Sequence, residues 1–396
     1  MPSPPSNRRC GGEETTQSGP LGERADILLC IPDCVRKGIH IRRFFAGEVG
    51  LSLSRQRVPL RILHMIDKHN REINYLRISI TDRCNLRCVY CMPKEGVSFI
   101  GHEDILRYEE MLRIVNVAVK TGIAKVRVTG GEPLVRRGVT EFLSSLKEVD
   151  GLKDISLTTN GLLLEGCAEA IFDAGIRRIN ISLDSLVADR YRDITRGGDL
   201  GSVIRGIQKA HRTGFSPIKI NVVAIQGFND DEILDFAKLT IDKPYQIRFI
   251  EFMPIGDPAL ENGLGYLSND EIIRRIDDFS PLEPVIPTRR DNMNGPARLY
   301  TLRDAQGRIG FISAMSHGFC SSCNRLRLTA DGHLRACLLA DEPTVDLKTP
   351  LRNGCTDSEL EALIRNLIGR KPDSYKIDCH QGHRRKCATN MSSIGG

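Results

Sequence analysis

Tryptophan is absent from this chain of 396 residues, and aromatic residues make up only 5% of it. Proteins that bind nucleic acid strands commonly stack the bases on exposed aromatic side chains. The scarcity of aromatics therefore argues against that class, although the net charge is +6. No apolar run approaches the ~20 residues that a membrane-spanning helix needs. A composition of 40% hydrophobic and 27% charged residues is typical of a soluble globular protein.

Cysteine, in contrast, is plentiful, with 13 residues in the chain. A disulfide framework would spread these residues along the sequence, whereas six of them form two groups of three. Grouped cysteines in a large chain indicate metal ligands and a reducing compartment such as the cytoplasm. The two groups are Cys84, Cys88 and Cys91, and Cys320, Cys323 and Cys337.

The first group has the spacing CxxxCxxC and directly follows an apolar, β-branched run. Soft thiolate ligands favour iron–sulfur clusters, zinc or cuprous copper. Structural zinc sites use four protein ligands, whereas a [4Fe–4S] cluster held by only three thiolates leaves one iron open to a small molecule. The spacing therefore predicts such a cluster, with three structural cysteines as the alternative.

The second group offers three thiols again, and Arg325 and Arg327 lie between its members. These two arginines are two positions apart, so they share one face if the segment is extended. A second cluster with an open iron is one interpretation. A structural zinc site completed by His333 or Cys355 is the other.

Between residues 75 and 280 short β-branched runs alternate with amphipathic segments, which predicts strands and helices in alternation. The expected strands are 75–81, 125–130, 155–159, 178–184, 218–225 and 246–252. The expected helices lie near 108–121, 138–149, 166–174, 202–213, 230–240 and 268–278. Six β/α units predict a parallel sheet, either doubly wound or curled into an incomplete barrel. A proline-rich linker at 280–287 ends this pattern, and short strands, a helix near 357–369 and a basic tail follow it.

Active sites of parallel β/α folds lie at the carboxyl ends of the strands. The expected strands end here in polar or glycine-rich motifs, among them Thr129-Gly-Gly-Glu-Pro133 and Thr158-Thr-Asn-Gly161. Cations also lie inside the apolar runs, where an unpaired charge is costly. A polyphosphate would neutralise the whole set, whereas internal salt bridges to Glu132, Asp184 and Glu251 are the alternative. These cations are Arg77, Lys125, Arg127, Lys219 and Arg248.

The first cysteine group with Tyr90, together with the Thr129–Pro133 motif, resembles the radical S-adenosylmethionine (SAM) superfamily. The segments Phe319-Cys-Ser-Ser-Cys-Asn-Arg-Leu-Arg327 and Ile394-Gly-Gly396 resemble one family within it. This is the molybdenum cofactor biosynthesis protein A family, the GTP 3′,8-cyclases. The resemblance runs from about Met65 to the C-terminus. It does not cover residues 1–64, which are expected to be a disordered extension or translated sequence upstream of the start.

The resemblance implies an incomplete (β/α)6 TIM-like barrel, the radical SAM fold, over residues 65–286. A smaller C-terminal α+β domain over 287–396 would carry a second cluster and a glycine tail that reaches into the active site. The implied cofactors are SAM and two [4Fe–4S] clusters, one for each cysteine group. The implied substrate is GTP, which is cyclised to (8S)-3′,8-cyclo-7,8-dihydroguanosine 5′-triphosphate in the first step of molybdopterin synthesis, a lyase-type reaction.

The resemblance also implies roles for individual residues. Those matching SAM-binding positions are Tyr90, Gly131, Ser182 and Met253. Those matching positions around GTP are Arg77, Lys125, Arg127, Thr158, Lys219, Arg248, Arg325 and Arg327. Arg77, Arg325 and Arg327 are further expected to take part in catalysis.

The expected partners are an electron donor and the enzyme of the following pterin-forming step, with no nucleic acid and no membrane, and a homodimer is a hypothesis. Two other functions stay open at this point. A radical SAM maturase that modifies peptides would also carry an auxiliary cluster, but it needs no inward set of cations. A zinc protein that binds nucleic acid would show an exposed basic face with stacking aromatics.

Overall fold

The computed structural model describes residues 65–253, 265–286, 295–339, 342–374 and 391–395. The predicted extension 1–64 and most of the basic tail, residues 375–390, lie outside the described residues. Within them, no helix is long and apolar enough to cross a membrane.

The sheet is built around six parallel strands that neighbour one another in chain order. All six lie close to the positions predicted for them, because each is a short β-branched run between turn residues. They are β1 (Tyr75–Ser79), β2 (Lys125–Thr129), β3 (Asp154–Thr159), β4 (Arg178–Ser182), β5 (Ile218–Gln226) and β6 (Tyr245–Glu251).

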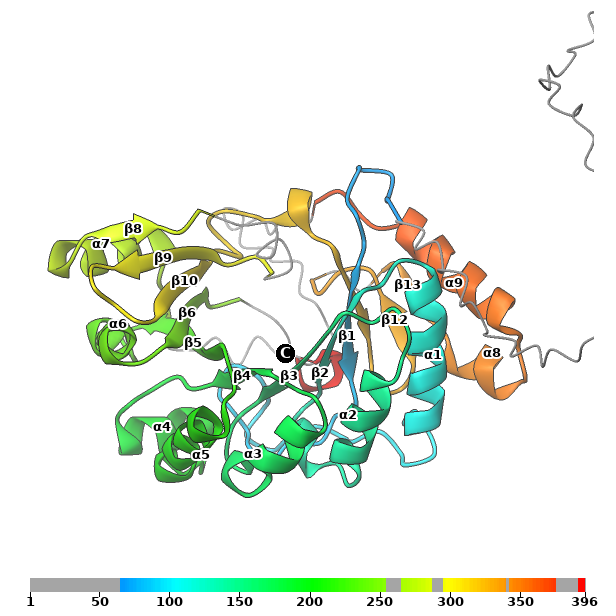
Figure 1. Ribbon diagram of the computed structural model, residues 1–396, viewed down its shortest axis with the longest axis horizontal. Helices are drawn as coiled ribbons and strands as arrows, with labels where there is room; N and C mark the ends of the chain where they lie inside the picture. The colour runs from blue at the N-terminus through cyan, green and yellow to red at the C-terminus, as the bar shows by residue number, and fades with distance from the viewer. Residues whose placement is uncertain (1–64, 254–264, 287–294, 340–341, 375–390, 396) are drawn as a thin grey trace, which may run out of the picture. The chain divides into compact units, whose positions relative to one another are not determined.

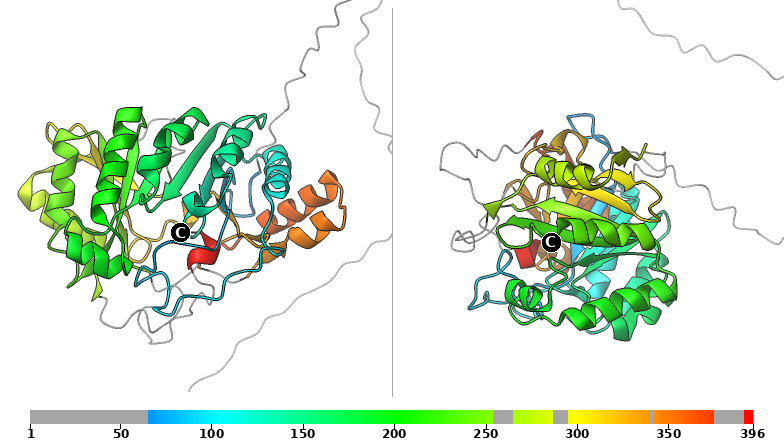
Figure 2. Two further views of the ribbon diagram at one scale, coloured as in Figure 1. Left: turned by 90° about the horizontal axis from the view of Figure 1, so that it is seen from below. Right: turned by 90° about the vertical axis from the view of Figure 1, so that its left-hand side faces the viewer.

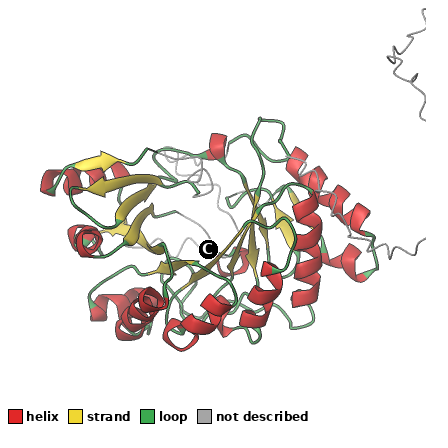
Figure 3. Cartoon of the chain, in the orientation of Figure 1, coloured by secondary structure: helices red, strands yellow, loops and turns green. Residues whose placement is uncertain are grey.

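Helices cover the convex side of this curved sheet (Figures 1 and 3). The expected ones are α1 (Tyr108–Lys120), α2 (Val139–Lys147), α3 (Leu164–Asp173), α5 (Leu200–Thr213), α6 (Ile233–Asp242) and α7 (Asn269–Phe279). The sequence analysis missed α4 (Ala188–Thr195), which is mostly polar and buries only Tyr191, Ile194 and Thr195. Short helix η1 (Pro133–Val135) follows β2.

The C-terminal part of the chain continues the same sheet at both of its edges. At one edge β10 (Arg308–Ile312) pairs in parallel with β6 and is followed outward by β9 (Arg298–Leu302) and β8 (Leu282–Pro284). At the other edge β11 (Arg325–Leu328) pairs in parallel with β1, followed by β12 (His333–Arg335) and β13 (Thr344–Asp346). Within the described residues the two ends of this order do not pair, so the barrel is incomplete, as predicted. The division at residue 286 stays a prediction.

The remaining elements are short or peripheral. β7 (Gly265–Tyr266) pairs with β5, and η4 (Cys320–Ser322) precedes β11. Helices α8 (Lys348–Arg352) and α9 (Asp357–Gly369) follow β13, and α9 packs against α1. The final helix α10 (Met391–Ile394) lies on the concave side of the sheet (Figure 2).

The strands alternate between an apolar and a polar face, and this alternation creates the site. Leu76 and Ile78 of β1, like Val126 and Val128 of β2, are at most 1% exposed and join the main hydrophobic core. Their neighbours in the chain point to the opposite face, where the polar and charged side chains gather. The helices therefore bury the apolar face, and the polar face surrounds the hollow of the open barrel.

Candidate active site

The first cysteine group lies in the loop after β1 and lines a hollow of about 130 Å³. The loop packs tightly on the glycine motif that follows β2. A Cβ atom on Gly131 would lie 2.4 Å from the carbonyl oxygen of Arg83, so only glycine permits this approach. Within the loop, the backbone N–H of Leu86 donates to Cys84 Sγ at 3.3 Å. The three cysteines and the glycine pair thus line the same hollow. This is expected, because both motifs follow the carboxyl ends of neighbouring parallel strands.

The second cysteine group lies near the start of β1, because Arg325, two residues after Cys323, is aligned with Tyr75. Cys320 and Cys323 border η4, and Cys337 follows β12, so that all three line a hollow of about 90 Å³. Burial opposes ionisation of the Cys323 thiol, but Arg325 and Lys371 outweigh it and lower its pKa to about 7. Burial instead raises the pKa of the Cys91 thiol to about 12. The two cysteine groups therefore lie in different electrostatic surroundings.

Neither group has the geometry of a site for one metal ion. Among the described residues, no three His, Cys, Asp or Glu side chains are grouped to hold a single ion. His333, one of the two candidates for a fourth zinc ligand beside Cys355, lies 3.1 Å from Asp331. Each cysteine group lines a hollow, which suits the wider spacing of ligands around a cluster. The structure therefore gives the zinc alternative no support.

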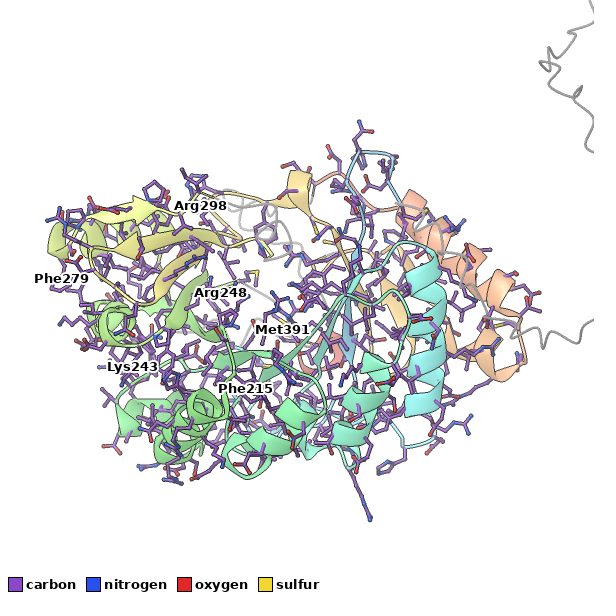
Figure 4. All side chains as sticks on the ribbon, in the orientation of Figure 1. Phe215, Lys243, Arg248, Phe279, Arg298 and Met391 are labelled. Carbon is purple, nitrogen blue, oxygen red and sulfur yellow. The ribbon has the colours of Figure 1, made fainter. Side chains whose placement is uncertain are left out.

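A cavity of about 210 Å³ shares lining residues with both hollows. It shares Tyr90, Thr158 and Ser182 with the hollow of the first cysteine group. It shares Met253, Arg325 and Arg327 with that of the second. Figure 4 shows Arg248 and Met391, which also line it, on the concave side of the sheet. The central cavity thus adjoins the hollows of both cysteine groups.

Five arginines line this cavity, and the register of the strands explains how they meet. Arg77 of β1 is aligned with Arg127 of β2 on one side and with Arg327 of β11 on the other. The remaining two are Arg248 and Arg325. Aligned residues of neighbouring strands point to the same face of a sheet. Because Arg77 points inward, Arg127 and Arg327 point inward as well.

Two of the predicted cations, Lys125 and Lys219, do not line the cavity. Lys125 is 2% exposed, its Nζ lies 3.2 Å from Asp154, and it approaches the ring centre of Tyr75 to 4.8 Å. Lys219 is equally buried. Lys125 lies in the same row as Tyr75 and Arg325. The assignment of both lysines to GTP stays a prediction.

Like charges crowd this face. Burial and the neighbouring Arg327 hold the pKa of Arg77 well below its ordinary value. Burial and Arg248 together lower the pKa of Lys219 to about 5. An arginine keeps its proton in proteins, so the crowding leaves a concentrated positive field. Such a field attracts a polyanion and is relieved by it.

The carboxylates proposed as alternative partners are occupied by neutral donors. Glu132 accepts hydrogen bonds from the hydroxyl of Thr159 at 2.8 Å and from the backbone N–H of Asn160 at 2.6 Å. Glu251 accepts from two backbone N–H groups at the start of the segment after β10. Asp184 accepts from Tyr90 Oη at 2.6 Å. These carboxylates therefore brace loops around the site.

Several polar atoms in the cavity wall lack a partner. Within the described part of the chain, Tyr75 Oη, Thr158 Oγ1 and Asn221 Oδ1 are buried and make no hydrogen bond. Buried polar atoms are nearly always satisfied in folded proteins, so these three indicate a polar ligand. The sequence analysis missed Tyr75 and Asn221 as site residues, although both occupy inward positions in the two-residue strand period.

The C-terminal end of the chain reaches into the same site. Ile394 is fully buried, and Arg327 donates through Nη1 to the carbonyl oxygen of Gly395 at 2.7 Å. Gly395 has a φ of +80°, and a Cβ atom there would lie 2.6 Å from Thr129 Cγ2. This placement of Gly395 agrees with the resemblance, and Gly396 lies outside the described residues.

Two known protein families match this chain, one before β6 and one from β6 onward. The profile of the radical SAM superfamily matches residues 78–240, and the profile described as Molybdenum Cofactor Synthesis C matches 245–377. A GTP 3′,8-cyclase of Pelotomaculum thermopropionicum is 50% identical over 332 residues, covering 84% of this chain and 100% of that protein. A GTP 3′,8-cyclase of Moorella thermoacetica is 51% identical, with the same coverage of both chains. The chain belongs to the GTP 3′,8-cyclase family.

Solved structures agree with this fold. SuiB of Streptococcus suis, in a crystal structure bound to the precursor peptide SuiA, matches with a TM-score of 0.56 at 15% identity. The match covers 78% of this chain and 69% of SuiB. At this identity the likeness shows the fold alone, so it does not favour the maturase alternative. Membership of the radical SAM superfamily implies SAM and a [4Fe–4S] cluster as cofactors, and the CxxxCxxC loop falls within the superfamily match.

Proposed function

We propose that this chain catalyses the reaction of its family, the conversion of GTP to (8S)-3′,8-cyclo-7,8-dihydroguanosine 5′-triphosphate in molybdenum cofactor biosynthesis. The observation that carries the proposal is the central cavity with five arginines in its wall, which shares lining residues with a three-cysteine hollow on each side. A peptide substrate would not require this concentration of positive charge, whereas a triphosphate does.

At the first end, Cys84, Cys88 and Cys91 would hold the [4Fe–4S] cluster. When bound, this cluster supplies the electron that cleaves SAM to a 5′-deoxyadenosyl radical. We assign the binding of SAM to the residues between this hollow and the central cavity. They are Tyr90, Gly131, Ser182 and Met253. The hydrogen bond from Tyr90 to Asp184 supports the assignment, because it fixes the tyrosine between the two spaces.

At the second end, Cys320, Cys323 and Cys337 would hold a second [4Fe–4S] cluster, whose open iron would bind the guanine. The protein residues around GTP would be Arg77, Lys125, Arg127, Thr158, Lys219, Arg248, Arg325 and Arg327. Arg77, Arg325 and Arg327 would act on the reacting nucleotide directly, and the others would hold its phosphates. The unsatisfied hydroxyl of Thr158 and the crowded positive charges support this assignment.

In the proposed reaction, SAM cleavage would supply the radical that removes the hydrogen atom from C3′ of the ribose, and C3′ would then bond to C8 of the base. Ring closure leaves one electron and one proton to be added, so an electron donor is a required partner. The residues of the wall hold C3′ and C8 in reach of one another and exclude water from the radicals. We further propose a cytoplasmic setting, hand-over to the enzyme of the next pterin-forming step, and a homodimer.

The position of hydrogen abstraction tests the proposal. Anaerobically reconstituted, reduced protein is incubated with SAM and with GTP that carries deuterium at C3′. We expect deuterium in the 5′-deoxyadenosine, detected by mass spectrometry, and none when the deuterium is placed at C2′. Deuterium from any other position would contradict the proposed chemistry, even if SAM is cleaved.

A further inference from the structure

Two buried cations outside the cavity tie together the segments that carry the second cysteine group. Arg71 lies before β1 and is 5% exposed, and Lys371 lies just after α9 and is 2% exposed. Neither belongs to the strand cations, and neither lines the cavity. Both reach the loops of the second group from distant parts of the sequence.

Arg71 binds the loop of Cys320. Its Nη1 donates to the carbonyl oxygen of Cys320 at 2.8 Å and to that of Asp373 at 2.9 Å. Its Nη2 donates to the carbonyl oxygen of Pro372 at 2.7 Å. Asp67 neutralises it, because Arg71 Nε donates to Asp67 Oδ2 at 2.7 Å. Arg71 therefore joins the segment after α9 to the cysteine loop and carries its own counterion.

Lys371 binds the other two segments. Its Nζ donates to the carbonyl oxygen of Arg325 at 2.8 Å and to that of Ala336 at 2.5 Å. Arg325 lies two residues after Cys323, and Ala336 directly precedes Cys337. The ammonium group of Lys371 therefore binds the backbone next to Cys323 and the backbone next to Cys337.

The charge of Lys371 is not balanced in the way that Asp67 balances Arg71. Burial lowers the pKa of Lys371, and the neighbouring cations Arg71 and Arg325 lower it further, whereas the Cys323 and Cys337 thiols act in the opposite direction. A buried ammonium is costly unless an anion compensates it. The thiolates of the second cysteine group, with the cluster proposed for them, can supply this anion.

We propose that Lys371 is a positioning residue of the second iron–sulfur site, where it fixes Cys323 and Cys337 through their backbone and raises the reduction potential of the cluster. This inference rests on the second cluster proposed above. Three thiolates give a [4Fe–4S] cluster a net negative charge, which grows when the cluster is reduced. A nearby fixed cation stabilises the reduced form more than the oxidised form, and net charge and hydrogen bonding are known to set such potentials.

The test uses the full chain with Cys84, Cys88 and Cys91 changed to serine, so that only the second cluster assembles. The midpoint potential is measured by redox titration followed by electron paramagnetic resonance. Lys371→Met keeps a long, unbranched side chain and removes the charge. We expect it to disfavour reduction about tenfold, a shift of about 59 mV to lower potential for a one-electron couple.

Two variants control for packing. Lys371→Arg keeps the charge, and we expect its potential to stay close to that of the parent. Arg370→Met removes the exposed neighbouring charge and should leave the potential unchanged. A Lys371→Met protein that binds the cluster with the parent's potential would overturn the inference. Loss of the cluster in Lys371→Met but not in Lys371→Arg supports it, and equal loss in both overturns it.

Failure of the proposed function is recognised separately. The parent protein with the three serines should contain about four iron and four sulfide per chain. If this protein binds no iron and sulfide, the assignment of a second cluster is wrong, and so is the proposed role of Lys371. If it binds the cluster and the potential ignores Lys371, only the present inference is wrong.

Discussion

Substitution of Gly395 by alanine tests whether the C-terminal turn must dock in the cavity. Gly395 has a φ of +80°, a left-handed conformation that costs a residue with a side chain about 1 kcal/mol. The new Cβ atom would also lie 2.6 Å from Thr129 Cγ2 and 3.2 Å from Ser79 Cβ. Two strands of the core hold these atoms, so the turn itself has to move.

Moving the turn breaks the hydrogen bond between Arg327 and the carbonyl oxygen of Gly395. A hydrogen bond to a charged group contributes about 1.5–3 kcal/mol. Together with the backbone strain, the loss is about 3 kcal/mol, which lowers the docked population roughly a hundredfold. We expect GTP turnover to fall at least tenfold, while the free energy of unfolding changes little, because the helices and sheet do not depend on the tail.

The assay is anaerobic turnover of GTP by Gly395→Ala, compared with Gly369→Ala as control. Gly369 ends α9, and a Cβ atom there meets nothing within 4 Å, so its variant should keep full activity. Thr129→Ser removes the methyl group that the alanine would meet, and it should restore part of the turnover in the double variant. Turnover within twofold of the parent for Gly395→Ala would refute this reasoning.

Three other changes follow from the structure. Cys88→Ser should abolish SAM cleavage both with and without GTP, and residual cleavage would exclude Cys88 as a ligand. Arg327→Ala should lower GTP turnover while substrate-independent SAM cleavage survives, and equal loss of both would contradict its substrate role. Burial opposes ionisation of Glu110, but hydrogen bonds from Arg352 and Arg107 outweigh it and lower its pKa to about 2. Its stabilising contribution is therefore complete above its ordinary pKa of about 4.5 and lost as the pH falls toward 2. The free energy of unfolding of Glu110→Gln should accordingly depend less on pH in that window, and an unchanged slope would contradict the pairing.

The parts predicted from sequence are those that local patterns determine. The six parallel strands are β-branched runs between turn residues, and the cysteine groups follow from spacing alone. The alternation of inward and outward residues also follows from the strand period. It predicted that Arg325 and Arg327 share one face if their segment is extended, and both lie on β11 and line the cavity.

The parts not predicted depend on contacts between distant segments. The parallel pairing of β11 with β1 joins residues about 250 positions apart, and no local pattern specifies it. The same pairing decides that Lys371 and Arg71 are buried beside the second cysteine group. The partner of Lys125 was also wrongly sought among Glu132, Asp184 and Glu251, since Asp154 on the adjacent strand lies within 3.2 Å. Which polar side chains become buried, and with which partners, is thus decided by strand pairing that local sequence patterns do not specify.

The dependence of 5′-deoxyadenosine formation on GTP tests the central claim most directly. Reduced, anaerobically reconstituted protein is incubated with SAM, with or without GTP, and the nucleoside is measured by liquid chromatography. The proposed function predicts a large rise with GTP and a cyclised product that yields a pterin. Formation of 5′-deoxyadenosine at the same rate with and without GTP would contradict it, and would leave a radical SAM enzyme that acts on another anion.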